Sequence, residues 1–174
     1  MKKTNYLYEL ERQAQECGLL LRIKINRPLN LWALRLVVAS CINPNKIIIL
    51  GEMKAWAYSR KHGFQLDTMR VSQSAPSGVG HLIWAATMAW ALEETPCKKA
   101  RLLAIRDEED QHKKLVRYFQ MRGFEFIREV GSDPLDLHLR MIWGGSGMLM
   151  NADCELVLQK SYSLWNSSSF KRNK

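Results

Sequence analysis

Cysteine and histidine are too few and too scattered in this 174-residue sequence to predict a metal centre or a disulfide framework. The four cysteines form no CxxC or CxxH spacing, and the four histidines form no HExxH pair. We therefore expect no metal site. We also expect free thiols, as a reducing compartment maintains them. The cysteines are Cys17, Cys41, Cys97 and Cys154.

Long hydrophobic runs are also missing. The longest apolar stretch, residues 79–92, is too short to cross a bilayer and contains His81. Two lysines follow Met1, as in a signal peptide, but Glu9 and Glu11 come before any apolar segment. We expect no membrane span, and a cytoplasmic location or an organelle after processing.

Acidic residues are outnumbered by basic ones, 17 against 26, which gives a net charge of +9. Such a charge favours anionic partners: nucleic acid, an acidic protein, an anionic membrane surface or a phosphate-rich cofactor. The basic residues are dispersed, however, and no RNA-recognition or helix-turn-helix pattern is visible. We expect a solvated basic surface that binds no specific nucleic acid. Any association should be weak, independent of sequence and lost as salt rises.

The composition that is present, 47% hydrophobic and 25% charged, is typical of a soluble globular protein. A chain of this length fits one domain with a substantial core. We place that domain at residues 1–150. Residues 151–174 are interpreted as a C-terminal extension, partly mobile, in which no helix or strand can be assigned.

Residues 64–124 are the most informative stretch and predict strand, turn, helix, strand, helix. Residues 64–72 alternate as a strand does, and 100–105 form the short apolar run of a strand covered on both faces. Between them, the apolar positions recur with the helical period of 3.6, which predicts a helix over residues 78–94. Acidic residues followed by basic ones predict a second helix over 108–122.

The turn between the first strand and helix contains Gly78-Val79-Gly80, and Ser77 is placed to cap the helix. A strand that leads through such a turn into a helix can hold phosphate, because free N–H groups converge at the helix start. For this motif alone, an ordinary strand-to-helix turn is the commoner explanation.

The order and spacing of these elements resemble the core of the GNAT acetyltransferase superfamily. That core has a strand ending in V-x-P, a turn Q/R-x-x-G-x-G/A, a helix, a strand, and a helix closing with Y-x-x-x-G-F. This chain has Val71, the turn 75–80 and the ending 118–124, with sequence YFQMRGF. The resemblance implies an α/β fold with a mixed, mostly antiparallel sheet of about six or seven strands flanked by helices. It also implies that strands 64–72 and 100–105 are parallel neighbours that splay apart beside the glycine turn.

The same resemblance implies acetyl-CoA as cosubstrate and an amine as acceptor, on a small molecule, a lysine or a protein N-terminus. It places the pyrophosphate on the backbone of Ser77, Gly78, Val79, Gly80, His81 and Leu82. It places the pantetheine arm along Met69, Arg70 and Val71. His112 and Phe119 would also contact the cofactor.

Three positions depart from the family pattern. Ala75 stands where the family has Gln or Arg, and Pro76 has no N–H to offer. Phe119 occupies the place of the tyrosine that is thought to protonate the leaving thiolate. In addition, His112 stands where many members carry asparagine.

Other residues are candidates for the missing chemistry. Tyr118 is the candidate acid, although it points about 100° away from position 119 around a helix. Glu52 or Asp67 is the candidate general base. Two functions therefore stay open: an N-acetyltransferase, or a GNAT-fold protein that has lost catalysis and serves as an interaction or assembly factor. A basic nucleic-acid-associated protein is a third, less favoured interpretation.

Outside the GNAT-like stretch, we expect a helix over residues 4–17 capped by Thr4, and strands over 19–26, 46–58, 124–130 and 137–143. Residues 29–42 fit either a helix, through Leu31, Leu34 and Val38, or a strand, and we favour a helix. Residues 166–169 and the basic end after them should be mobile.

Overall fold

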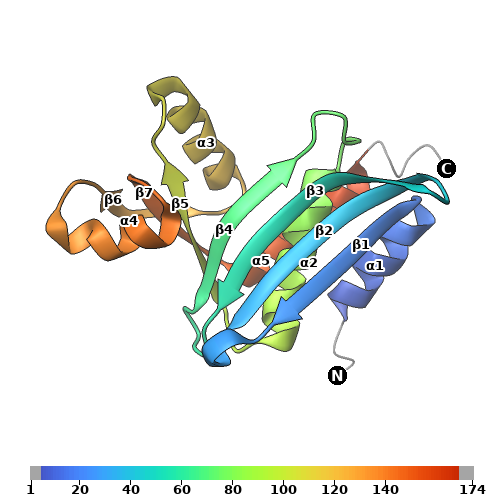
Figure 1. Ribbon diagram of the computed structural model, residues 1–174, viewed down its shortest axis with the longest axis horizontal. Helices are drawn as coiled ribbons and strands as arrows, with labels where there is room; N and C mark the ends of the chain where they lie inside the picture. Colours follow the sequence, from blue (N-terminus) through green and yellow to red (C-terminus); the bar gives the residue numbers. More distant parts are fainter. Residues whose placement is uncertain (1–4, 169–174) are drawn as a thin grey trace.

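Seven strands form one sheet, in the order β1-β2-β3-β4-β5-β7-β6, in the computed structural model, which describes residues 5–168 (Figure 1). Only β4 and β5 pair in parallel; the other neighbours are antiparallel. The predicted mixed, mostly antiparallel sheet flanked by helices is therefore confirmed. The strands are β1 (Leu19–Asn26), β2 (Trp32–Asn43), β3 (Lys46–Ala57), β4 (Phe64–Val71), β5 (Lys99–Ile105), β6 (Glu125–Val130) and β7 (Gly147–Asp153).

Five α-helices accompany the sheet within the described residues: α1 (Tyr6–Glu16), α2 (Val79–Glu94), α3 (Glu109–Met121), α4 (Leu137–Trp143) and α5 (Cys154–Ser167). The helices predicted over 4–17, 78–94 and 108–122 are confirmed. Thr4 lies outside the described residues, and the side chain of Asn5 caps α1 by accepting from the Tyr8 N–H at 3.1 Å. No helix within residues 5–168 is long and apolar enough to cross a membrane.

Helix α2 forms the centre of the core. It lies between the sheet and α5, and Figure 1 shows α2 and α5 on the same side of β1–β4. Because both sides of α2 are covered, it is apolar around its whole circumference, and Trp84, Met88 and Trp90 are all buried. This packing holds the first turn of α2 in a fixed position beside the end of β4.

Two predicted elements are wrong. Residues 32–43 form β2 rather than a helix, because Leu34, Leu36 and Val38 alternate inward with the period of a strand. The helical pattern expected here also included Leu34 and Val38. The apolar residues therefore fitted both the helical period of 3.6 and the strand period of 2. Residues 137–143 form α4 rather than a strand. A helical turn begins before it, where Asp133 accepts from the Leu135 N–H at 2.8 Å and Pro134 takes the first helical position.

The domain boundary predicted at residue 150 is also wrong. Strand β7 lies between β5 and β6 in the sheet, and α5 packs against α2 through Val157, Leu158 and Trp165. The C-terminal segment up to residue 168 therefore belongs to the core. Residues 166 and 167 lie in α5, and the predicted mobility of 169–174 falls outside the described residues.

The face of the sheet that points away from α2 carries a row of like charges. Lys24 on β1 lies opposite Arg35 on β2, which lies opposite Lys54 on β3. All three side chains are exposed, and Arg35 also forms an ion pair with Glu52, outside this row, at 3.1 Å. Like charges directly opposite one another on a sheet destabilise it.

Substituting Lys54→Glu should therefore raise the free energy of unfolding by about 0.5–1 kcal/mol, because one repulsive cross-strand pair becomes attractive. Urea denaturation would show a higher midpoint with an unchanged slope. The increase in the free energy of unfolding should be smaller in 1 M salt, where charges more than about 3 Å apart are largely screened from one another. A lower midpoint at low salt would contradict this explanation of the row.

Candidate functional site

The two parallel strands at the centre of the sheet separate soon after they meet. Their ladder contains two pairs, Phe64 with Ala100 and Gln65 with Arg101. Beyond these pairs β4 continues along β3 and β5 continues along β7, so the two strands diverge (Figure 1). The predicted splay beside the glycine turn is thus confirmed.

A cleft of about 400 Å³ lies where the strands have separated. It is lined by Asp67, Thr68, Met69, Leu103, Ile105, Asp107, Gln111, His112, Leu115 and Phe119, from β4, β5, α3 and the loop before α3. Its size suits a small-molecule site. Three residues predicted to contact the cofactor, Met69, His112 and Phe119, meet here.

His112 carries an unsatisfied nitrogen in this lining. Its Nδ1 lies 3.1 Å from the carbonyl oxygen of Ile105, and a carbonyl can only accept, so the proton sits on Nδ1. In the neutral ring, Nε2 is then a hydrogen-bond acceptor. Nε2 is buried and has no partner among residues 5–168, and the side chain is only 6% exposed. Buried polar atoms are rarely left unpaired, so a ligand N–H at this point would complete the site.

The glycine turn requires glycine at Gly78 for two reasons. Its φ is +104°, a left-handed conformation, and a Cβ there would lie 2.7 Å from Oγ of Ser168. Gly78 is also the residue that caps α2, with no side-chain hydrogen bond. The prediction that Ser77 caps this helix is wrong, because the chain enters the helix through the left-handed Gly78.

The free N–H groups at this turn are fewer than the sequence predicted. The N–H of Leu82 donates to the Gly78 carbonyl at 2.9 Å, and that of Val79 donates to Pro76 at 3.3 Å. In the described part of the chain, the N–H groups of Ser77, Gly78, Gly80 and His81 have no partner. Those of Gly80 and His81 belong to the first turn of α2, where the helix dipole favours an anion.

The turn adjoins the cleft. A Cβ built on Gly80 would lie 3.8 Å from Cε of Met69 and 3.9 Å from Cγ2 of Val71, so the first turn of α2 rests against the end of β4. Met69 also lines the cleft. The glycine turn and the cleft are therefore joined at Met69.

A cluster of polar and aromatic side chains lies between α2 and α3. The Arg122 guanidinium is stacked on two rings, with Cζ 4.4 Å from the centroid of Tyr118 and 5.4 Å from that of Trp84. Its Nη1 lies 3.4 Å from Nδ1 of His81. Burial lowers the pKa of His81, and the positive charge of Arg122 lowers it further. Burial also lowers the pKa of Arg122, and Tyr118 offsets part of that effect.

Tyr118 belongs to this cluster and not to the cleft lining. Its hydroxyl accepts from the indole N–H of Trp84 at 2.9 Å, so it is directed toward α2. Phe119, its neighbour, lines the cleft instead. The structure thus separates Tyr118, the candidate acid, from the cleft that Phe119 lines.

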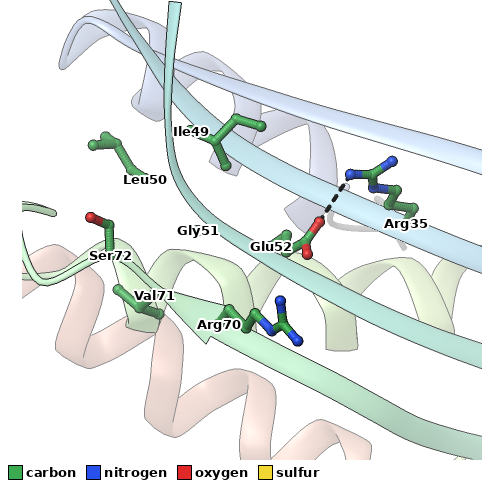
Figure 2. A pocket seen from close by; sticks show the side chains of 8 residues that line it. All are labelled: Arg35, Ile49, Leu50, Gly51, Glu52, Arg70, Val71 and Ser72. Atoms are coloured by element: carbon green, nitrogen blue, oxygen red, sulfur yellow. Dashed lines mark hydrogen bonds and ion pairs between the residues drawn. The ribbon is translucent and has the colours of Figure 1, made fainter.

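Glu52 is likewise outside the cleft lining. It lies in a separate hollow of about 310 Å³ on the outer face of the sheet, shown in Figure 2. One of its carboxylate oxygens pairs with Arg35 at 3.1 Å, and Arg70 is its cross-strand neighbour on β4. Two guanidinium groups therefore surround the predicted base. Asp67, the alternative base, does line the cleft.

The role of Arg122 was not predicted from the sequence. This residue follows Leu115 and Phe119 at the spacing i, i+4, i+7, which places it on the inward stripe of α3. A charged residue at one of these inward-facing positions was the feature of the sequence that could have identified Arg122. Asp107 and Gln111 of the cleft were missed as well, since nothing in their spacing distinguishes them from an ordinary helix start.

Other chemistry finds no support in the described residues. No three His, Cys, Asp or Glu side chains within residues 5–168 are grouped as metal ligands. Burial raises the pKa of Cys154 to about 12, so its thiol is not a nucleophile at neutral pH.

Comparison with known proteins finds no matching family model and no matching curated protein. Among solved structures, the chain is similar to the crystal structure of an uncharacterized protein from Bacillus halodurans. The two share 18% sequence identity with a TM-score of 0.46, over 80% of this chain and 66% of that one. The chain thus spans slightly less than two thirds of that protein.

Proposed function

We propose that this chain is a GNAT-like N-acetyltransferase that binds acetyl-CoA between β4 and β5 and transfers its acetyl group to an amine. One observation carries the proposal: β4 and β5 part after two residue pairs, and the cleft between them adjoins the first turn of α2. This arrangement would offer an anion site for phosphates beside a cleft, partly apolar in its lining, for an extended arm.

The unsatisfied polar groups of the site fit this ligand. The N–H groups of Gly80 and His81 would hold pyrophosphate oxygens, and Nε2 of His112 would accept from an amide N–H of the pantetheine arm. His112 thereby takes the place of the asparagine that many members of the family carry. Leu103, Leu115 and Phe119 supply the apolar walls.

A residue of the cleft can also activate the acceptor amine. When bound, acetyl-CoA supplies an activated acetyl group as a thioester. Asp67 is an exposed carboxylate on β4 beside Thr68 and Met69, so it can take a proton from the ammonium of an acceptor that enters from solvent. The four free cysteines agree with a reducing cytoplasm, where we place this activity.

A second function is favoured by the cleft lining itself. Among residues 5–168 no tyrosine lines the cleft, because Phe119 occupies it and the Tyr118 hydroxyl is bonded to Trp84. A protein that binds acetyl-CoA without rapid transfer could serve as an interaction or assembly factor. The two functions differ in turnover, which an assay of thiol release can measure.

Phe119→Tyr is expected to leave the Kd for acetyl-CoA unchanged and to raise thiol release, with a panel of amines, by about 10²-fold. The reason is that a general acid is restored at the cleft wall. Tyr118→Phe serves as the control and should leave turnover unchanged, since its hydroxyl faces Trp84. If acetyl-CoA binds but neither the wild type nor Phe119→Tyr releases thiol, the second function is the correct one.

A further inference from the structure

Arg122 is a buried cation that has no counter-ion among residues 5–168. Its side chain is 7% exposed, and it takes part in no ion pair within the described residues. Its Nε is buried with no hydrogen-bond partner there. Burying a charge that is neither paired nor fully hydrogen-bonded is strongly unfavourable, so a protein that retains one has a use for it.

The groups around Arg122 compensate its charge only in part. The guanidinium lies against Tyr118 and Trp84, and Nδ1 of His81 is 3.4 Å away. The rings attract a cation only weakly compared with a carboxylate or a phosphate. His81 is only partly buried, so solvent reaches this end of the cluster.

The position of Arg122 connects it to both parts of the candidate site. It follows Phe119, which lines the cleft, by one helical turn on the same stripe of α3. It also touches His81, whose backbone N–H is unpaired in the first turn of α2. A guanidinium, a helix N-terminus and the end of the cleft thus occur together.

We infer that Arg122, with His81 and the first turn of α2, forms a subsite for a phosphate group. Arg122 would supply donors that Ala75, with no polar side chain, and Pro76, with no N–H, do not offer. The inference rests on the proposed function in identifying the phosphate as that of acetyl-CoA. Arg122 binds the anion by charge-assisted hydrogen bonds from its nitrogens. The side chain is therefore a ligand-binding residue rather than a packing residue.

The test is Arg122→Met, compared with Arg117→Met on the exposed face of the same helix. Arg122→Met should weaken acetyl-CoA binding by about 10- to 100-fold and leave binding of S-acetylpantetheine, which lacks the phosphates, unchanged. It should also raise the Tm of the ligand-free protein, because an unpaired buried charge is removed. Arg117→Met should change none of these.

A structural role makes the opposite prediction. If Arg122 only ties α3 to α2 through the two rings, Arg122→Met should lower the Tm and leave the affinity for acetyl-CoA unchanged. An unchanged affinity, whatever the Tm, overturns the inference.

Failure of the proposed function can be recognised separately. Should the wild type fail to bind acetyl-CoA, inorganic pyrophosphate becomes the probe. A rise in Tm with pyrophosphate in the wild type, absent in Arg122→Met, would support the anion subsite without the cofactor. If pyrophosphate does not raise the Tm of the wild type, the inference of a phosphate subsite at Arg122 is overturned.

Discussion

Replacing Trp165 by alanine is expected to lower the free energy of unfolding by about 3–5 kcal/mol, as for other fully buried tryptophans. Trp165 is 0% exposed, and its indole N–H donates to Oε1 of Gln13 at 2.9 Å, which ties α5 to α1. A Cβ at Gly78 would lie 3.3 Å from its ring, so Trp165 also supports the turn before α2. Urea denaturation followed by circular dichroism would measure the loss.

Leu164→Ala is the matched control, since this neighbour on α5 is 46% exposed and should cost less than about 0.5 kcal/mol. A loss for Trp165→Ala as small as that for Leu164→Ala would mean that α5 is peripheral. The core would then end near residue 150 after all.

Gly80→Glu is expected to abolish the stabilisation of the protein by acetyl-CoA. At a hundred times its Kd, a ligand adds about 2.7 kcal/mol to the folded state, which for a domain of this size raises the Tm by about 5–10 °C. The new carboxylate would occupy the anion site at the N–H groups of Gly80 and His81 and repel phosphate. The fold should tolerate the change, because a Cβ at Gly80 makes only ordinary contacts, at 3.8 and 3.9 Å.

Gly131→Glu is the control for charge and side-chain size. A Cβ at Gly131 meets nothing within 4 Å, and Gly131 lies after β6, away from the turn before α2. This variant should keep the full ligand-induced shift. Gly78→Glu is unsuitable, because the left-handed backbone and the 2.7 Å approach to Ser168 would unfold the turn itself. A Gly80→Glu protein that still shows the wild-type shift would refute the anion site at α2.

The stretch from β4 to α3 could be predicted from sequence because each element there has one dominant period and a clear end. The helical period of α2, the acidic-to-basic order of α3 and the punctuation by Gly78 and Gly123 all agree with the observed bounds. The errors at β2 and α4 have the opposite cause. Residues 32–43 are apolar enough to fit two periods. The alternation of residues 137–143 has no continuous buried face to support it, since Leu137 and Met141 are exposed while Trp143 is buried.

The candidate site was predictable only as far as the backbone defines it. Met69, His112 and Phe119 were assigned from the resemblance to the GNAT core, and the structure brings them together. The partners of Tyr118, Glu52 and Arg122 depend on side chains from other elements, at separations that no local pattern encodes.

The most direct test of the acetyl-CoA site is a crystal structure of the protein grown with acetyl-CoA. The account predicts pyrophosphate oxygens within about 3 Å of the N–H groups of Gly80 and His81, and an amide of the pantetheine arm at the same distance from Nε2 of His112. The arm should run between β4 and β5. Acetyl-CoA ordered anywhere else, or none bound at millimolar concentration, would contradict the account.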